Sequence, residues 1–200
     1  MSIVYTKNIK PAEPSIKEIL RYAGVKQTDN EILPLIESCI NEIKEKLSFR
    51  VCYRVLSVNI NEDVCDFGDF KVNSKDLAKN LKDSEHVLIF ASTIGIEIDR
   101  IIAKYSRISP SKTLIFDALG AERIEALCDS FCEEFSKEKG VLLKPRFSAG
   151  YGDLPLTVQR EIFSQLNPDR KIGLTLNESL LMSPSKSVTA FAGIKVGVII

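Results

Sequence analysis

The residue types best suited to chemistry lie in one short stretch, residues 146–151, which reads Arg-Phe-Ser-Ala-Gly-Tyr. The Arg146 guanidinium is a planar fork of donors that matches a carboxylate. Gly150 has no Cβ, so backbone N–H and C=O groups can lie directly against a ligand there. The Tyr151 ring can stack on a base or lie near a cation, and its hydroxyl can form hydrogen bonds. The stretch therefore suits a small zwitterionic ligand.

Each of these residues also has an ordinary structural interpretation. Arg146 could be a surface or salt-bridged arginine, Gly150 could serve only a turn, and Tyr151 could be a core aromatic with a satisfied hydroxyl. Ser148 and Ala149 would contribute mainly backbone contacts to a ligand. The stretch alone leaves both interpretations open.

The stretch resembles the Arg-x-x-x-Gly-Tyr motif of the activation domain of cobalamin-dependent methionine synthase. A second block, residues 176–190, reads Leu-Asn-Glu-Ser-Leu-Leu-Met-Ser-Pro-Ser-Lys-Ser-Val-Thr-Ala. It is similar to that family's Leu-Thr-Glu-Ser-x-x-Met-x-Pro-x-x-Ser-Val-Ser-Gly. The matching residues are Leu176, Glu178, Ser179, Met182, Pro184, Ser187 and Val188. Both blocks occur in the family's order, and the resemblance covers roughly residues 140–195.

The resemblance implies an S-adenosylmethionine-binding domain. Arg146 would hold the ligand carboxylate, and the backbone of residues 148–151 would contact the rest of the ligand. Glu178 is a candidate partner for the ligand ammonium, for the ribose or for a docking protein, with a structural cap as the alternative. Ser187 is expected to hold its loop in place. In the family, the methyl group and an electron from a flavodoxin-like donor restore methylcobalamin, so no side chain acts as acid or base and no catalytic residue is expected.

Departures from the family pattern refine this expectation. The cobalamin-binding Asp-x-His-x-x-Gly signature is absent, so cobalamin would come from a partner protein. We therefore expect an accessory subunit that reactivates a separate methionine synthase and so acts as a component of that methyltransferase in methionine biosynthesis. The alternative is an S-adenosylmethionine sensor or interaction module without methyl transfer. The family has an acidic residue before its arginine that contacts the ligand ammonium. In this sequence that position is Gly140, and Glu138 or Asp153 could replace the missing contact.

Composition narrows the class of protein. The 200 residues include 27 basic and 27 acidic ones without a basic cluster, which disfavours nucleic-acid binding. There is no apolar run of the roughly 20 residues that span a bilayer and no signal-peptide core at the N-terminus, so we expect a cytoplasmic protein that does not bind membranes. The 5 cysteines fit free, buried thiols, and a single histidine without a Cys-x-x-Cys pair gives no support for a metal site.

Several elements must position the two blocks. Residues 50–60 alternate as a strand does, and the apolar run at residues 86–91 predicts a strand that is buried on both faces. Ser109-Pro110 predicts the start of the longest helix, and Gly140 its end. Gly120, inside that helix, predicts a close approach by another backbone. Asp153 is expected to cap a helix that ends at residue 166, and residues 172–176 and 187–196 read as the final strands.

The N-terminal quarter reads as helical. A capping box at Ser15 and Glu18 predicts a short helix that stops at Gly24, and residues 29–47 form an amphipathic pattern. We therefore divide the chain into a helical segment, 1–48, and a ligand-binding domain, 49–200, expected to form one compact unit. The irregular mixture of elements predicts an α+β fold with a mainly antiparallel, twisted sheet and flanking helices, as in the methionine synthase activation domain.

Overall fold

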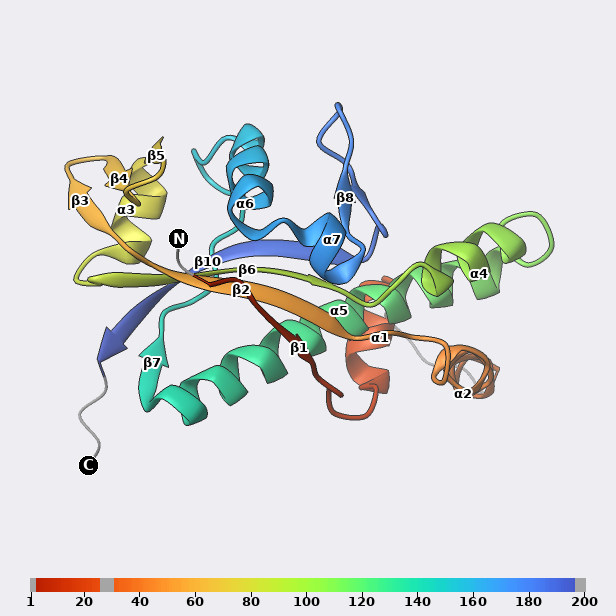
Figure 1. Cartoon of the computed structure of the whole chain (residues 1–200). Coiled ribbons are helices and arrows are strands. Elements are labelled where there is room, and N and C mark those ends of the chain that lie inside the picture. Colours follow the sequence, from red (N-terminus) through yellow and green to blue (C-terminus); the bar gives the residue numbers. More distant parts are fainter. Residues whose placement is uncertain (1–2, 26–30, 197–200) are drawn as a thin grey trace.

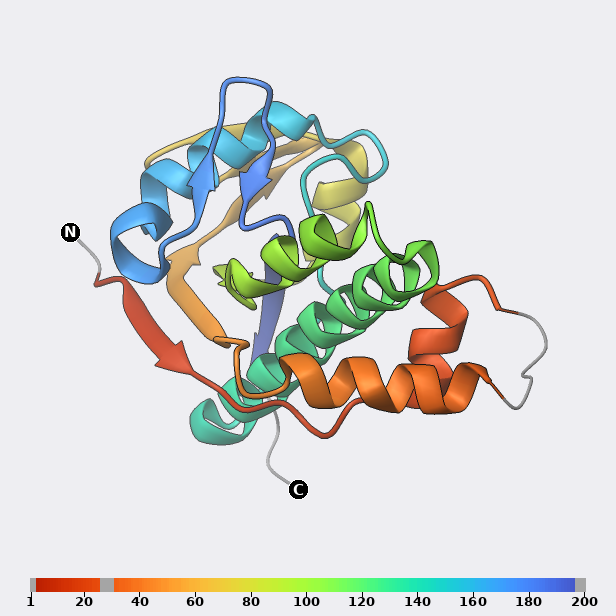
Figure 2. The same cartoon turned by 90° about the vertical axis from the view of Figure 1, so that its right-hand side faces the viewer.

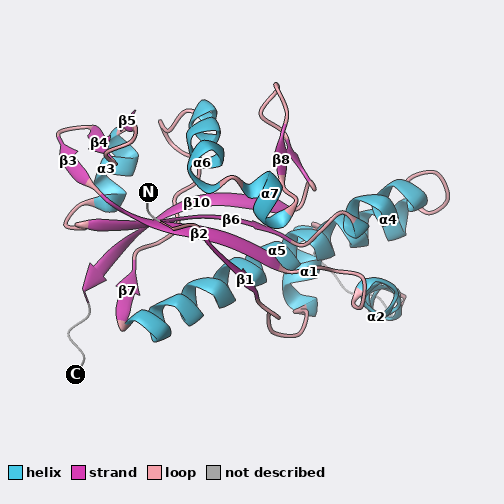
Figure 3. Ribbon diagram, in the orientation of Figure 1, coloured by secondary structure: helices cyan, strands magenta, loops and turns pink. Residues whose placement is uncertain are grey.

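The computed structural model describes residues 3–25 and 31–196. A five-stranded sheet crosses the molecule with helices on both faces (Figures 1 and 3), and every strand pair in it is antiparallel. Its order is β1 (Tyr5–Asn8), β2 (Arg50–Ser57), β6 (His86–Thr93), β10 (Ser187–Val196) and β7 (Val141–Leu143). A three-stranded sheet consists of β3 (Asn59–Asn61), β4 (Val64–Asp66) and β5 (Lys71–Asn73). A two-stranded sheet consists of β8 (Thr175–Leu176) and β9 (Met182–Ser183). The predicted α+β fold with an antiparallel sheet is confirmed.

Two hydrophobic cores lie on opposite faces of this sheet. One face is covered by α1 (Ile16–Tyr22), α2 (Ile32–Ile43), α4 (Glu97–Tyr105) and α5 (Pro110–Lys139). The other is covered by α3 (Lys75–Leu81), the short 3₁₀ helix η1 (Leu156–Val158), α6 (Gln159–Leu166) and α7 (Pro168–Ile172). Because successive side chains of a strand point to opposite faces, Leu88 and Phe90 of β6 enter the first core, while Val87 and Ile89 enter the second. The prediction of a strand buried on both faces is confirmed.

Helix α5 has the boundaries that its sequence predicts. The Ser109 hydroxyl accepts a hydrogen bond from the Lys112 backbone N–H at 3.4 Å, and Gly140 ends the helix with a φ of 62°. Figure 2 shows α4 lying along α5. A Cβ on Gly120 would lie 2.9 Å from Cγ1 of Ile98 in α4. The close approach is therefore real, but side chains make it, not the backbone that we expected.

The N-terminal segment packs against α5. Strand β1, which the sequence did not predict, pairs with β2, and α1 and α2 contribute to the same core as α5. The buried ion pair of Glu122 and Arg123 holds the connection before α1. Arg123 donates to the Ala12 carbonyl at 2.6 Å, and the Ser15 N–H donates to Glu122 at 3.1 Å. The predicted helix at 29–47 is shorter, since α2 ends at Ile43, and residues 29–30 lie outside the described residues.

The expectation that Asp153 caps the following helix is wrong. Its carboxylate accepts hydrogen bonds from the backbone N–H groups of Lys75 at 2.8 Å and Asp76 at 3.2 Å, and from the Ser74 hydroxyl. Asp153 thus caps α3, far away in sequence, and ties the loop after residue 150 to that helix. The strand expected at 172–176 is also shorter, because residue 172 still belongs to α7.

The described residues contain no helix whose length and apolar character would let it cross a membrane. Nor do they bring three or more His, Cys, Asp or Glu side chains together as a metal ion would require. The cysteines are unpaired, and Cys39, Cys52, Cys65 and Cys128 are buried. Cys132 is half-buried, so it does not belong wholly to the core as expected.

Candidate functional site

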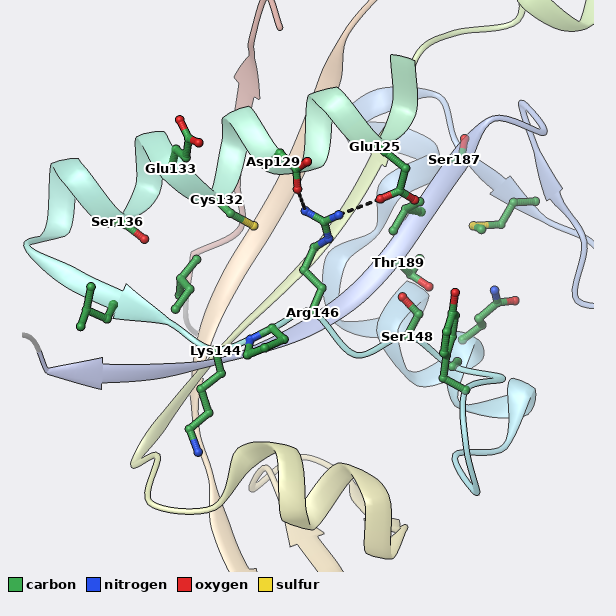
Figure 4. Close-up of a pocket in the computed structure, with 18 of the residues that line it drawn as sticks. Glu125, Asp129, Cys132, Glu133, Ser136, Lys144, Arg146, Ser148, Ser187 and Thr189 are labelled. Atoms are coloured by element: carbon green, nitrogen blue, oxygen red, sulfur yellow. Dashed lines mark hydrogen bonds and ion pairs between the residues drawn. The ribbon is translucent and has the colours of Figure 1, made fainter. Parts of the chain in front are cut away.

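A cleft of about 930 Å³ opens between the C-terminal half of α5, strand β7 and the start of β10 (Figure 4). Helix α5 contributes polar side chains to it, among them Glu125, Asp129 and Cys132. The lining residues that face α5 come from the loop after β7, and this loop contains the stretch 146–151. The cleft therefore lies at the stretch that the sequence singles out.

Arg146 points from this loop towards α5 (Figure 4). Its Nη1 lies 2.5 Å from Oδ1 of Asp129, and its Nη2 lies 2.7 Å from Oε2 of Glu125. Residues four apart on a helix share a face, so both carboxylates reach the same guanidinium. Arg146 is therefore salt-bridged and also lines the cleft. A guanidinium has more N–H groups than these two ion pairs use, so it retains donors for a further carboxylate.

The loop that carries Arg146 is fixed to the central sheet. The Phe147 N–H donates to the Phe191 carbonyl at 2.8 Å, and the Phe191 N–H donates back to the Phe147 carbonyl at 2.8 Å. Phe191 is a fully buried residue of β10. This pairing places the guanidinium beside β10 without help from a ligand.

The rest of the stretch forms a tight turn. Gly150 has a φ of 90°, a conformation that favours glycine, and its N–H donates to the Leu154 carbonyl at 2.9 Å. The Tyr151 N–H donates to the Ser148 carbonyl at 3.2 Å, so both of these backbone donors are used within the loop. Ser148, Ala149 and Tyr151 line the cleft, whereas Gly150 shapes the turn behind it. Tyr151 is 69% exposed, which excludes the interpretation as a core aromatic.

The second block reaches the same cleft. It forms β8, β9 and the start of β10, and Met182, Ser187, Val188 and Thr189 are lining residues. The Ser187 hydroxyl donates to the Pro184 carbonyl at 2.8 Å, which confirms its expected role in holding the loop. Glu178 is exposed in the turn between β8 and β9, outside the lining residues, and its carbonyl accepts a hydrogen bond from Arg160 at 3.3 Å.

The sequence offered Glu138 and Asp153 as replacements for the family's acidic contact to the ligand ammonium, but neither lines the cleft. Glu138 pairs with Lys7 at 2.6 Å, and Asp153 caps α3. The carboxylates that do line the cleft are Glu125, Asp129 and Glu133 of α5. Their spacing of four residues on a helix is the signal that could have pointed to them, but the sequence does not show which helix face meets the loop.

Gln159, Cys132 and Lys144 are among the further lining residues that the sequence did not predict. Gln159, at the start of α6, is 6% exposed, and its Oε1 has no hydrogen-bond partner among the described residues. Burial raises the pKa of the Cys132 thiol, although the positive charge of Arg146 acts in the opposite direction. The Lys144 ammonium points away from Arg146 (Figure 4) and donates to the Lys82 carbonyl. Gln159 is thus a buried lining residue whose side-chain oxygen lacks a partner within the described part of the chain.

Comparisons with known proteins identify the fold. No protein-family model matches the chain, and no curated protein matches it. Among solved structures, the crystal structure of the MetH reactivation domain bound to AdoHcy superposes with a TM-score of 0.70 and 14% sequence identity, over 96% of this chain and 78% of that chain. The chain has the fold of the MetH reactivation domain. The family resemblance read from the two sequence blocks is confirmed at the level of the fold.

Proposed function

We propose that this chain binds S-adenosylmethionine in the cleft beside Arg146 and serves as an accessory subunit for reductive methylation of the cobalamin of a separate methionine synthase, in the cytoplasm. One observation carries the proposal. The two blocks that resemble the activation domain, although separated in sequence, line the same cleft in a chain with that fold. AdoHcy, which the structural neighbour binds, is S-adenosylmethionine without its transferable methyl group.

The chemistry of the cleft fits this ligand. S-adenosylmethionine carries a carboxylate, an ammonium and a sulfonium. Arg146 offers a guanidinium to the carboxylate, and the carboxylates of Glu125, Asp129 and Glu133 give the α5 wall a negative character that suits the two positive groups. The exposed Tyr151 ring offers a face to the adenine. A volume of about 930 Å³ lies within the range of about 300–1,000 Å³ that is typical of small-molecule sites.

The residues of the cleft would contribute by positioning the methyl group of the bound ligand for transfer. The oxidised, inactive cobalamin of the partner would take one electron from a flavodoxin-like donor and the methyl group from the sulfonium of S-adenosylmethionine, whose methyl–sulfur bond breaks, and AdoHcy would leave. Arg146 and the α5 carboxylates would fix the amino-acid end of the ligand, so that the sulfonium faces a constant direction. This reaction requires no proton transfer, so we propose no catalytic residue in this chain.

Two measurements test the proposal in order. Titration calorimetry with S-adenosylmethionine and AdoHcy first measures binding. The protein is then mixed with a cobalamin-loaded methionine synthase that lacks its own activation domain, a reductant and methyl-labelled S-adenosylmethionine, and label on the cobalt is measured. Transfer of label supports the accessory subunit. Binding without transfer identifies a sensor or interaction module, and the absence of binding refutes an S-adenosylmethionine site.

A further inference from the structure

Strand β10 has a free edge where it borders the cleft. On one side it pairs with β6 along residues 187–194, whereas on the other side β7 pairs with it only along residues 194–196. Phe147 exchanges two hydrogen bonds with Phe191 on this outer side. Before Phe191, no strand that the structure describes pairs with the outer edge. A sheet edge carries unpaired N–H and C=O groups, so this part of β10 can accept a further partner.

Thr189 is the residue whose backbone groups this free edge leaves unpaired. The N–H and C=O groups of successive residues in an antiparallel strand point to alternate sides. Because Phe191 uses both of its groups on the outer side, those of Thr189, two residues earlier, also point outwards, towards the cleft that Thr189 lines. Neither group forms a hydrogen bond to any residue that the structure describes. Thr189 is only 2% exposed, and unpaired backbone groups are rare at such positions.

The Thr189 hydroxyl is also without a partner among the described residues. Unlike the Ser84 hydroxyl, which is unpaired but closed off from solvent, it retains accessible surface, and Thr189 lines the cleft (Figure 4). The hydroxyl of the neighbouring Ser187 shows the contrast, since it donates to the Pro184 carbonyl at 2.8 Å and is satisfied within the protein. Thr189 thus brings an N–H, a C=O and a hydroxyl group, none of them paired within the described chain, to one point of the cleft.

Contacts across the cleft bring Arg146 towards the same edge. Its guanidinium pairs with Asp129 of α5. The sulfur of the adjacent Cys128 lies 3.2 Å from Oγ of Ser92, and Ser92 is paired in the sheet with the residue before Thr189. The guanidinium and the unpaired groups of Thr189 therefore border the same part of the cleft.

We propose that the α-amino-acid end of the ligand pairs with this edge of β10, as a single residue added to the sheet opposite Thr189. The Thr189 N–H donates to the ligand carboxylate, which Arg146 also holds, and the Thr189 C=O and hydroxyl accept from the ligand ammonium. Opposite residues of an antiparallel pair exchange two such bonds, and a free α-amino acid carries the same donor and acceptor on one carbon. This inference rests on the proposed function and extends it, because it supplies the ammonium contact that Glu138 and Asp153 do not make.

Amide hydrogen exchange, followed by NMR on the full isotope-labelled chain, tests this pairing at Thr189 itself. The probes are AdoHcy and methylthioadenosine, which lacks the amino-acid end of AdoHcy. We expect saturating AdoHcy to slow exchange of the Thr189 amide about 10-fold, because a hydrogen bond must then open before exchange. Methylthioadenosine is expected to leave that rate unchanged. The Phe191 amide, which already donates to Phe147 at 2.8 Å, serves as the internal reference and should exchange at one slow rate throughout.

Thr189→Val removes the hydroxyl, keeps the shape of the side chain and leaves both backbone groups in place. By titration calorimetry this variant is expected to bind AdoHcy about 10-fold more weakly, with an unchanged affinity for methylthioadenosine. Its Tm without ligand should be equal or higher, because the lost hydroxyl has no partner among the described residues. The matched control is Thr175→Val, which removes a hydroxyl that donates to the Ser183 carbonyl at 3.2 Å outside the cleft. It should bind AdoHcy as the unaltered protein does.

Several results would overturn the inference alone. They are an exchange rate of the Thr189 amide that AdoHcy leaves unchanged, and equal slowing of that exchange by methylthioadenosine. A Thr189→Val variant that binds AdoHcy with full affinity, or that loses affinity for both probes alike, has the same consequence. In each of these cases the unaltered protein still binds AdoHcy, so the proposed function stands. An unaltered protein that does not bind AdoHcy overturns the proposed function as well.

Discussion

Replacement of Arg146 by alanine would separate ligand binding from fold stability. The variant loses the ion pairs to Glu125 and Asp129, whose side chains are 45% and 68% exposed. The two carboxylates are screened by solvent, although the Arg146 side chain itself is only 23% exposed, so each pair is expected to contribute about 1 kcal/mol and the free energy of unfolding to fall by about 2 kcal/mol. A charged hydrogen bond to a ligand carboxylate contributes about 1.5–3 kcal/mol. Arg146→Ala is therefore expected to weaken binding of AdoHcy about 10- to 100-fold.

Titration calorimetry and urea unfolding measure the two effects in the same preparations. Arg146→Lys keeps a positive charge but lacks the planar fork, so we expect it to bind with intermediate affinity. Arg160→Ala is the matched control, because Arg160 lies outside the cleft and donates to the Glu178 carbonyl at 3.3 Å. It should bind AdoHcy as the unaltered protein does. Unchanged affinity in Arg146→Ala, with only a loss of stability, would show that Arg146 serves the fold and not a ligand.

Three further outcomes are expected. In Gly120→Ala, overpacking against Ile98 should cost about 1–3 kcal/mol and outweigh a gain of about 1 kcal/mol in helix propensity; urea unfolding that shows a more stable variant would contradict this packing. The hydrogen bond from the Ser74 hydroxyl, with those from the α3 backbone, lowers the pKa of Asp153. The ionised Asp153 carboxylate therefore stabilises the fold above the unfolded pKa of about 3.9, and this stabilisation is lost as the pH falls through the lower folded pKa. Asp153→Asn lacks the carboxylate, so its free energy of unfolding should fall less in acid than that of the unaltered protein. Burial raises the pKa of Cys132, so it should react slowly with thiol reagents, and AdoHcy should slow it further; mass spectrometry that finds no protection would place the ligand elsewhere.

Features set by neighbouring residues could be read from the sequence. The hydroxyl of Ser109 and the left-handed conformation of Gly140 act within one helical turn, so both ends of α5 were predictable. The carboxylate of Asp153 shows the limit of such reasoning. Its sequence context is that of a helix cap, yet it caps α3, which lies more than seventy residues earlier. A local pattern does not reveal which of several helix ends a side chain meets in the folded chain.

For the same reason, the sequence predicted some residues of the cleft and not others. Arg146 was found because its neighbours in sequence form a motif. Glu125, Asp129 and Gln159 were missed because their role depends on which faces of α5 and α6 meet the loop, and tertiary packing decides that. The amphipathic pattern of α6 would even have assigned the position of Gln159 to the apolar core.

The paired hydrogen bonds between Phe147 and Phe191 bear on how fast a ligand can enter. They anchor the arginine loop to a buried strand, so the loop loses its conformational entropy on folding and not on binding. A molecule that enters the cleft therefore meets an arginine whose loop is already held in place. Association is then governed by diffusion and charge, and differences in affinity between related ligands will be found mainly in their residence times.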